Sequence, residues 1–415
     1  MVSPDSQRDF ALQIVEQLRA AGYEAFWAGG CVRDQLLGRV PKDYDVATGA
    51  RPEQVRELFG PRRTLAIGAA FGVISVLGRR NLDSIEVATF RSDGAYIDGR
   101  HPQSIVFSSV EEDARRRDFT INGLFFDPVQ RQVIDYVGGQ QDIHGQVVRA
   151  IGDAAARFGE DKLRMLRAVR FAAAFGFEIE SATFSAIQQM AGEVHVVSAE
   201  RIGSELRRIL VHPSRGLGLH LLLETGLLAA LLPNVARRFE ECQETWEQAR
   251  DALGRLKSVS LSVALATLFW GICDESDIRR HGRAFRFSNK EIERAAWLVG
   301  SLPAVAAAKR LPWPKLQPRL VHAGSADLMA VAEAVLGVDD EGCAFCEAKL
   351  QLPPEQLNPP LLVSGDDLVA CGLQPGREFA ELLDRVREVQ LDGRIGNREQ
   401  ALELIDGWVR ERGGR

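Results

Sequence analysis

The stretch Gly29-Gly30-Cys31-Val32-Arg33-Asp34, followed by Asp43-Tyr44-Asp45, decides how the chain is interpreted. Side chains two residues apart on a strand project from the same face, so Asp43 and Asp45 are expected side by side. Hard divalent cations such as Mg²⁺ prefer oxygen ligands, and a pair of them can activate a hydroxyl while neutralising a triphosphate leaving group. The two glycines let the backbone approach a phosphate closely, and Arg33 offers it a charged fork. The pattern predicts a metal site beside a phosphate-binding turn.

A solvated strand end is the alternative interpretation of an isolated Asp-x-Asp. The flanking Gly-Gly pair and the arginine at fixed distance favour the metal site. Glu86, within Ile85-Glu86-Val87-Ala88, is a third acidic candidate. A glutamate between apolar residues on a strand usually faces solvent, but an adjacent strand could bring it beside Asp43 and Asp45. The three carboxylates would then complete the metal site.

Composition and length limit the possible classes of protein. The 415 residues carry 57 acidic and 51 basic side chains, and the formal net charge of -6 excludes a simple polycation that coats nucleic acid by bulk charge. Hydrophobic residues make up 46% and charged residues 26%, which is far from the composition of disordered chains. The length predicts roughly two to four domains, each with a hydrophobic core.

The residue pattern of the sequence changes near Asp153. Before it, short apolar runs are separated by Gly and Asp/Asn turns, which indicates several strands with helices. After it, long 3.6-residue patterns rich in Ala, Leu, Arg and Glu predict an almost entirely helical region. The expected fold class is therefore α+β. Pro-rich stretches at residues 302–318 and 353–360 are the expected joints within the helical region.

Six scattered cysteines and a polar N-terminus favour a reducing cytoplasm. No apolar run reaches the ~18 to 20 residues needed to span a bilayer, so no membrane is expected as a partner. Cys343-Ala344-Phe345-Cys346 is a lone C-x-x-C without a second pair. Ordinary burial is expected there, with zinc binding or redox use as the alternative.

Four segments in order carry a resemblance to a known family. They are Gly-Gly-x-Val-Arg-Asp, Asp-x-Asp, Arg116-Arg117-Asp118-Phe119-Thr120-Ile121-Asn122, and Glu160-Asp161-x-x-Arg164-x-x-Arg167-x-x-Arg170-Phe171. Over roughly residues 25–235 the chain resembles the class II tRNA nucleotidyltransferase and bacterial poly(A) polymerase family. The resemblance implies a polymerase-beta-like nucleotidyltransferase head with a mixed sheet, followed by an all-helical neck, body and tail. The boundaries it implies are 1–149 for the catalytic head, 150–215 for the base-selecting neck, 216–302 for the body and 303–415 for a tRNA-binding tail.

The head motifs transfer to this chain residue by residue. The resemblance implies that Asp43 and Asp45 are the metal-binding pair and that Glu86 is the third catalytic carboxylate. It also implies that Gly30, with Gly29 beside it, and Arg33 contact the triphosphate.

In the Arg-Arg-Asp motif, the resemblance implies that Arg117 contacts the nucleotide and that Asp118 binds the ribose 2′-hydroxyl. A carboxylate suits that role because it accepts a hydrogen bond that only a ribose can donate. A surface basic run is the alternative for residues 115–117.

Asp161 and Arg164 are the candidates for base selection. They lie three apart on a predicted helix and are therefore expected to be neighbours on its surface. Cytosine and adenine both present an exocyclic amine donor beside a ring-nitrogen acceptor. An Asp acceptor beside an Arg donor complements both, whereas uracil and guanine would leave buried polar groups unpaired at ~1 to 3 kcal/mol each.

Arg167 and Arg170 continue this stripe as further nucleotide-binding candidates. Each step of three residues drifts by about 60° around the helix, so the arginines cannot all point one way. Arg167 is the expected phosphate or base contact, and Arg170 is expected to be partly structural. An ordinary Arg/Glu-rich amphipathic face is the alternative for this helix.

Two features indicate which member of the family the chain resembles. The segment from Arg91-Ser92-Asp93 to His101-Pro102 is a charged, Gly-rich loop that could be a plain surface connection. In the family, a flexible loop here is associated with terminal A addition and is shortened in enzymes that add only C. Poly(A) polymerases of the family tend to carry a basic pair before a Phe, where this chain has Ala69-Ala70.

The function implied is Mg-dependent, template-independent addition of CCA to tRNA 3′ ends from CTP and ATP, with release of pyrophosphate. The expected partners are the tRNA acceptor end and these two nucleotides, and no protein partner is indicated. A poly(A) polymerase and an A-adding-only tRNA nucleotidyltransferase are alternatives within the enzyme class. A noncatalytic RNA-binding protein on a nucleotidyltransferase scaffold is the alternative from another class, and the complete acidic set speaks against it.

Overall fold

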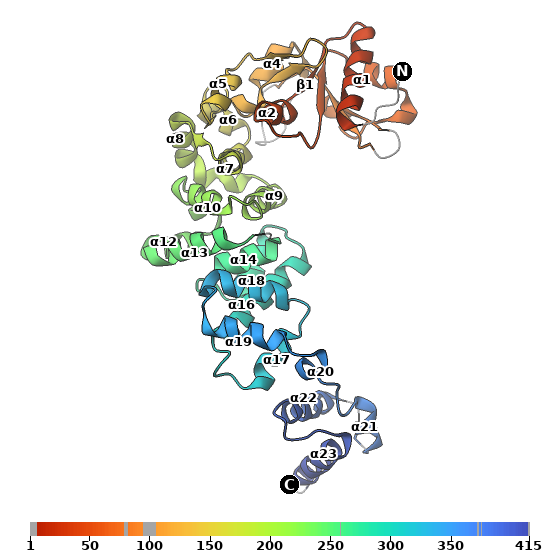
Figure 1. Ribbon diagram of the computed structural model, residues 1–415. Coiled ribbons are helices and arrows are strands. Elements are labelled where there is room, and N and C mark those ends of the chain that lie inside the picture. The colour runs from red at the N-terminus through yellow and green to blue at the C-terminus, as the bar shows by residue number, and fades with distance from the viewer. Residues whose placement is uncertain are drawn as a thin grey trace. The chain divides into compact units, whose positions relative to one another are not determined.

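The protein is described here by a computed structural model (Figure 1). It describes residues 6–78, 82–93, 105–257, 259–371, 373–374 and 376–413. The chain divides into two compact units, Met1–Cys242 and Gln243–Arg415. A mixed sheet with helices comes first and helices follow, so the expected α+β class is confirmed.

A seven-stranded sheet forms the first part of the N-terminal unit. Its strand order is β3-β4-β5-β2-β1-β8-β9, and of its neighbouring pairs only β2 and β5 run parallel. The strands are β1 (Ala25–Ala28), β2 (Asp45–Thr48), β3 (Thr64–Leu65), β4 (Val73–Val76), β5 (Ile85–Thr89), β8 (Phe125–Asp127) and β9 (Gln132–Ile134). Two further pairs stand outside it: antiparallel β6 (Arg91–Asp93) with β7 (Ile105–Phe107), and parallel β10 (Val147–Val148) with β11 (Glu178–Ile179).

The centre of the sheet is held by aromatic side chains. All four residues of β1 are buried. Phe26 of β1 packs against Phe90 and Phe125, with ring centroids 6.2 and 6.4 Å away. Trp27, which points the other way because strand side chains alternate, meets Tyr44 at 4.9 Å. Both faces of β1 are thus covered, and the strand that follows Tyr44 is fixed beside it.

Helices surround the sheet and then replace it along the chain. Those before residue 150 are α1 (Gln7–Ala20), α2 (Gly30–Leu36), α3 (Pro52–Phe59), α4 (Val110–Arg115) and α5 (Gly139–His144), with short 3₁₀ turns at Pro61–Arg63, Ala69–Phe71 and Thr120–Asn122. The rest of the unit contains α6 (Ala154–Glu160), α7 (Leu163–Phe175), α8 (Ser181–Met190), a 3₁₀ turn at Ala191–Val196, α9 (Ala199–Leu210), α10 (Arg215–Glu224), α11 (Leu227–Leu231) and α12 (Pro233–Glu241). Helix α7 packs on both α9 and α10 and is the centre of this helical part.

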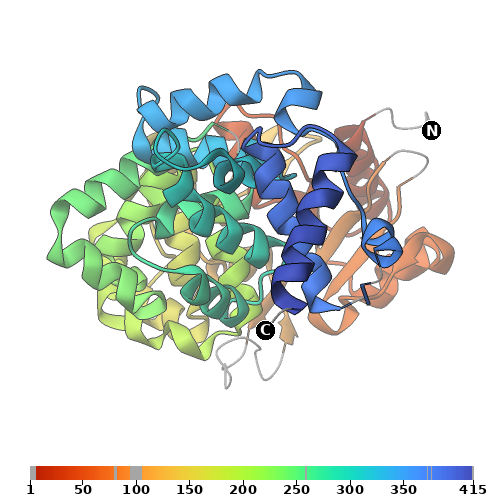
Figure 2. The ribbon, with the colours of Figure 1, turned by 90° about the horizontal axis from the view of Figure 1, so that it is seen from below.

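The C-terminal unit is helical throughout its described residues. Its helices are α13 (Gln243–Arg255), α14 (Leu261–Phe269), α15 (Glu275–Ala284), α16 (Asn289–Ala306), α17 (Trp313–Leu320), α18 (Ser325–Leu336), α19 (Glu341–Leu350), α20 (Pro354–Leu357), α21 (Gly365–Ala370), α22 (Arg377–Leu391) and α23 (Arg398–Gly413). Figure 2 shows α22 and α23 as a dark blue pair lying side by side, and an apolar cluster from Val363 to Ile405 fills the space around them.

The two boundaries expected within the helical region fall differently with respect to the helices. The boundary at 215/216 falls at the start of α10, and the boundary at 302/303 falls inside α16, which accommodates Pro303 and continues to Ala306. The compact units separate instead after Cys242. The division into neck, body and tail stays a prediction. Among the described residues, no helix is both long and apolar enough to cross a bilayer.

The glycines at 138 and 139 begin α5 for two different reasons. Gly138 has a φ of +79°, the left-handed region that favours glycine. Gly139 lies against the turn at Thr120, and a methyl group there would overlap the Thr120 carbonyl oxygen and lie 2.9 Å from Leu124 Cδ2. Close packing of α5 against residues 120–124 therefore requires this glycine.

Replacing Gly139 by Ala should destabilise the N-terminal unit by about 1–3 kcal/mol because the backbone must move to relieve the overlap. Thermal unfolding would show this as a midpoint lowered by roughly 2–10 °C. Gly159→Ala in α6 is the matched control, since nothing lies within 4 Å of its added methyl group. Equal midpoints for Gly139→Ala and the control would contradict the packing argument.

Candidate active site

Asp43, Tyr44 and Asp45 alternate between solvent and core as they enter β2. Tyr44 is buried against Trp27, while Asp43 and Asp45 on either side of it are exposed. The two carboxylates therefore lie on the same side of the strand, as the sequence predicted. The aromatic contact of the intervening tyrosine sets their direction.

Glu86 is brought beside this pair by the parallel strand β5. The register pairs Val46 with Val87, so Glu86 lies level with Asp45. Glu86 is exposed between buried neighbours Ile85 and Val87. Glu86 therefore lies on a strand next to that of Asp45, which is the position that the sequence offered as an alternative to a plain solvent-facing one.

The charges of these carboxylates act on one another. Partial burial, and then the charges of Glu86 and Asp43, raise the pKa of Asp45 to about 6, while Arg117 acts in the opposite direction. Across the described residues, no group of three or more His, Cys, Asp or Glu side chains is gathered as a ready-made metal site. The three-carboxylate metal site therefore stays a prediction. Asp43 and Asp45 remain as a two-carboxylate donor set.

Gly29 leaves room for the Arg117 side chain beside the turn before α2. Gly29 caps α2 with a φ of +71°, and a side chain there would meet Arg117 Nη1 at 2.9 Å. Arg117 donates to Asp113 Oδ2 at 2.9 and 3.2 Å, and Arg116 binds the other carboxylate oxygen. Burial acts to raise the pKa of Asp113, but the two guanidinium groups outweigh it and lower the pKa. Asp113 thus orients the basic pair.

Arg33 is almost buried and is held on every side. It donates to Asp34 Oδ1 at 2.7 and 2.9 Å and to Asn122 Oδ1 at 2.6 Å. Its guanidinium group lies over two rings of α7, 5.3 Å from the Phe171 centroid and 4.6 Å from that of Phe175. Arg33 therefore packs the turn that follows β1 against helix α7.

Asp118 joins the motif after α4 to α7 through Arg167. Its Oδ1 accepts from the Phe119 N–H and Asn122 Nδ2, and its Oδ2 accepts twice from Arg167, at 2.8 and 2.6 Å. Although burial acts to raise it, the charge of Arg167 and these hydrogen bonds lower the pKa of Asp118 to about 2. A carboxylate has about four lone-pair sites, so Asp118 is saturated. The predicted ribose contact requires one of these bonds to be exchanged.

Asp161 does not lie on a helix, which corrects the expected helical spacing to Arg164. Helix α6 ends at Glu160, Asp161 is extended (φ −148°, ψ 103°), and α7 begins at Leu163. The reason is local, since Asp161 Oδ1 accepts the Leu163 N–H at 3.0 Å and so replaces a helical bond. The other oxygen accepts from Arg201 Nη2 at 2.6 Å.

Arg164 pairs with Glu160 rather than with Asp161. Its Nη1 donates to Glu160 Oε2 at 2.6 Å and to the Arg157 carbonyl at 3.1 Å, and its Nη2 donates to the Arg116 carbonyl at 3.3 Å. One N–H of Nη2 and the Nε–H remain to donate. Each oxygen of Asp161 likewise has one protein donor and can accept another.

Arg170 makes structural contacts, as the sequence predicted. It donates to Oε2 of the buried Glu205 at 2.6 Å and lies 4.0 Å from the Phe171 ring centroid. Arg167 lies over the same ring at 5.2 Å. Phe171 is therefore the shared platform of these arginines.

All nine nucleotide-binding candidates line one cavity of about 510 Å³, together with the catalytic candidate Asp45. The lining contains six arginines and three aspartates, so the cavity is cationic although the chain as a whole is acidic. The lining residues are Gly29, Gly30, Arg33, Asp45, Arg116, Arg117, Asp118, Asn122, Asp161, Arg164, Arg167, Arg170 and Phe171. We call this the nucleotide cavity.

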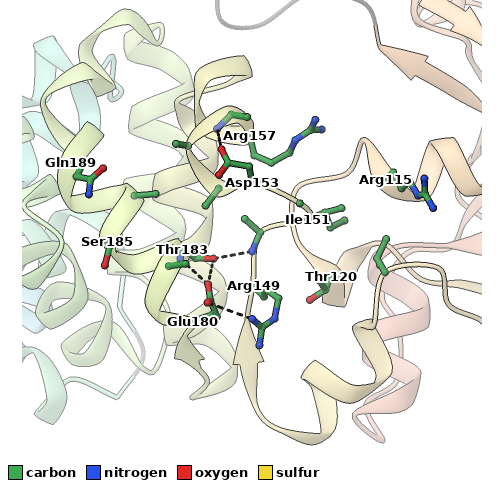
Figure 3. A pocket seen from close by; sticks show the side chains of 18 of the residues that line it. Arg115, Thr120, Arg149, Ile151, Asp153, Arg157, Glu180, Thr183, Ser185 and Gln189 are labelled. Atoms are coloured by element: carbon green, nitrogen blue, oxygen red, sulfur yellow. Dashed lines mark hydrogen bonds and ion pairs between the residues drawn. The ribbon is translucent and has the colours of Figure 1, made fainter.

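A larger cavity of about 870 Å³ lies at the joint between residues 149–157 and α8 (Figure 3). Arg115, from the predicted basic run, lines it. Its polar groups bind one another: Thr183 bonds the Ala150 N–H and Glu180, and Glu180 pairs with Arg149. These bonds fasten the joint and make this cavity a poorer candidate for the reaction.

Two family models match the chain. One is described as the poly A polymerase head domain and matches residues 25–149; the other is described as the probable RNA and SrmB-binding site of polymerase A and matches residues 176–239. The CCA-adding enzyme of Geobacillus kaustophilus is 34% identical over 415 residues, covering 97% of this chain and 96% of that protein. The chain belongs to the CCA-adding enzyme family.

The likeness extends over nearly the full chain. The CCA-adding enzyme of Streptococcus sanguinis is 32% identical over 409 residues, covering 97% of each chain. The crystal structure of Bacillus stearothermophilus CCA-adding enzyme in complex with CTP matches with a TM-score of 0.75 at 30% identity, over 97% of this chain and 98% of that one. The predicted family is confirmed, and with it the activity class, a tRNA nucleotidyltransferase.

Sequence reasoning missed the residues that hold the site in place. Asp113 stands three and four residues before the arginines it binds, a spacing that could have found it. Glu160 and Asn122 stood inside quoted motifs without a role. Arg201 and Glu205 come from α9, and no local pattern connects them to α7.

Asp118→Asn should destabilise the protein by about 2 kcal/mol at pH 7, because Arg167 loses its charged partner. The folded-state pKa of Asp118 is depressed, so its contribution is present above about pH 4 and is lost as the pH falls towards 2. Urea unfolding from pH 7 to pH 3 should show a constant difference from wild type above pH 5 that shrinks below about pH 4.

Glu111→Gln is the control for this pH series, since it removes the exposed partner of Arg115 in the same unit. It should change the unfolding free energy by less than about 1 kcal/mol. A difference between Asp118→Asn and wild type that persists unchanged at pH 3 would contradict the ion-pair assignment.

Proposed function

We propose that the chain adds C, C and A in turn to the 3′ end of tRNA, taking CTP and ATP into the nucleotide cavity. The observation that carries this is the convergence of nine separate candidates on one cationic cavity beside Asp45. The relatives are CCA-adding enzymes by name, and one was solved with CTP. An anionic nucleotide suits a cavity whose lining has twice as many arginines as aspartates.

Asp43 and Asp45 would hold the divalent metal, which we propose is Mg²⁺. The donor set fits, because two exposed carboxylates on one side of a strand, with Glu86 acting on Asp45, favour a hard cation. Mg²⁺ is commonly held by one or two carboxylates together with substrate phosphates, so a closed three-residue group is not needed. The metal would lower the pKa of the RNA 3′-hydroxyl and neutralise the departing pyrophosphate.

The chain's own groups would position the triphosphate. Gly29 and Gly30 open the turn before α2, and Arg33 and Arg117 present guanidinium groups beside it. Both arginines are anchored by carboxylates, at Asp34 and Asp113, so they are oriented before the nucleotide arrives. The 3′-hydroxyl would then attack the α-phosphate in line, with pyrophosphate leaving.

Asp118 would accept the ribose 2′-hydroxyl in place of one of its two bonds from Arg167. The exchange conserves the hydrogen bonds of the carboxylate and frees an N–H of Arg167 for the nucleotide. A deoxyribose lacks the 2′-hydroxyl and could not replace the Arg167 hydrogen bond to Asp118.

Asp161 and Arg164 would read the base with their remaining capacity. Each has hydrogen-bonding sites beyond those used by Arg201, Glu160 and the backbone, and both line the nucleotide cavity. An acceptor beside a donor matches the Watson–Crick edges of cytosine and adenine and mismatches those of uracil and guanine. The protein would thus serve as the template.

Two finer points stay predictions. Residues 94–104, which contain most of the loop associated with terminal A addition, lie outside the described residues. We place the reaction in the cytoplasm because all six cysteines are free thiols, which suits a reducing compartment. Burial raises the pKa of Cys343 to about 12 and of Cys346 to about 11, as expected of structural thiols.

Purified protein, offered tRNA that ends at its discriminator base, should add CCA when CTP and ATP are both present. UTP and GTP should be incorporated at least about 30-fold more slowly, since two unmatched buried groups cost about 2–6 kcal/mol. Sequencing of the products measures this. Long A tails made without CTP would indicate a poly(A) polymerase, addition of A only to ends that already carry CC would indicate an A-adding enzyme, and binding without addition would indicate a noncatalytic protein.

Asp43→Asn and Asp45→Asn should each lower kcat by at least 1,000-fold while the fold is retained, because the metal would lose a charged ligand. Single-turnover addition of one C, with circular dichroism as the check on folding, measures this. Glu57→Gln, an exposed carboxylate of α3, is the matched control and should keep full activity. Substantial activity of either aspartate variant would remove it from the metal site.

A further inference from the structure

Arg39 and Lys42 are two exposed cations in the segment between α2 and β2. Within the described part of the chain, neither side chain has a carboxylate within ion-pair distance. Arg39 is nevertheless positioned, because its guanidinium group lies 5.1 Å from the centroid of the Phe175 ring. A positioned cation without an anionic partner among the described residues can take one from outside the protein.

His212, between α9 and α10, belongs to the same group. Its Nδ1 accepts the Ser214 N–H at 3.2 Å, so in the neutral ring the proton is on Nε2, which can donate. Burial lowers the pKa of His212, and four cations add to this: Arg215, Arg39, Arg170 and Lys42. The cations that act on the His212 pKa come from three separate segments of the chain.

This group is continuous with the nucleotide cavity. Lys42 directly precedes Asp43. The Phe175 ring beneath Arg39 also carries Arg33, and Arg33 and Arg170 line the cavity. Arg39, Lys42 and His212 do not line the cavity themselves, and Arg39 and Lys42 lie in the segment that leads into β2.

The local excess of positive charge attracts an anion from outside the protein. Arg39 and Lys42 repel each other, and neither is paired with a carboxylate among the described residues. In a chain whose net charge is -6, such a pair of cations stands out. The triphosphate has its own arginines inside the cavity. The remaining polyanion of the reaction is the RNA, whose 3′ end must reach Asp43 and Asp45.

We propose that Arg39, Lys42 and His212, which we call the entrance cluster, bind the sugar-phosphate backbone of the RNA 3′ strand as it enters the nucleotide cavity. The inference rests on the proposed function, since it assumes that RNA is extended at this cavity. Arg39 and Lys42 contribute charge to the phosphates, and His212 donates one neutral hydrogen bond from Nε2. The interactions are sequence-independent, because backbone phosphates are the same in every tRNA.

The test is a kinetic comparison of wild type with the double variant Arg39→Gln/Lys42→Gln. KM for tRNA should rise by roughly 10-fold at about 150 mM salt, and the slope of log(kcat/KM) against log[salt] should become shallower by about 0.7–0.9 for each cation removed. KM for CTP and kcat at saturating tRNA should stay within two-fold of wild type. His212→Gln should raise KM for tRNA by a smaller factor with the salt slope unchanged, since it removes no charge.

Two controls make the outcome decisive. Arg56→Gln/Arg62→Gln removes two exposed arginines from the same unit and should leave both KM values and the salt slope unchanged. Arg39→Lys/Lys42→Arg keeps the charges and should keep KM for tRNA within two- to three-fold of wild type. An unchanged KM for tRNA and salt slope in the active double Gln variant would overturn the entrance cluster, as would a rise in KM for CTP, which would assign the cluster to the triphosphate. A wild-type protein that extends no RNA would instead overturn the proposed function.

Discussion

The ion pair between Asp118 and Arg167 is the constraint on which the rest of the site depends. The two groups lie 49 residues apart, one after α4 and one on α7, and each would be costly to leave alone once removed from water. Their two hydrogen bonds therefore fix the sheet-bearing part of the unit against α7. The turn before α2, the residues after α4 and the start of α7 then face a single cavity.

The site gathers many arginines because each is paired with a carboxylate, and Arg116 and Arg117 share that of Asp113. Arg33, Arg167 and Arg170 all lie over the Phe171 ring, and their carboxylate partners are Asp34, Asp118 and Glu205. The pairs limit repulsion between the guanidinium groups, and the ring gives them a surface to pack on. Some N–H groups remain for a ligand, which makes the cavity cationic and ordered before a nucleotide enters.

The sequence predicted what short-range geometry determines. The alternation through Asp43, Tyr44 and Asp45 follows from strand periodicity, and the order of motifs was enough to predict the family and the α+β class. The position of Glu86 needed the parallel pairing of β2 with β5, which local pattern could only offer as an alternative. The helical spacing of Asp161 and Arg164 was wrong because the Asp161 side chain binds the Leu163 N–H and ends the helical run. Arg201 and Glu205 could not be found, since their roles arise only when α9 packs on α7.

The break between α6 and α7 also links the nucleotide cavity to the larger cavity beside α8. Arg157 lines the larger cavity and pairs with Glu160 at 2.7 Å, and Glu160 in turn holds Arg164 in the nucleotide cavity at 2.6 Å. The orientation of Arg164, for which we propose a role in base reading, is therefore set partly by Arg157, which lines the other cavity. Under the proposed function, directed evolution of nucleotide preference need not be confined to residues that touch the base, because substitutions at Arg157 would act on Arg164 through Glu160.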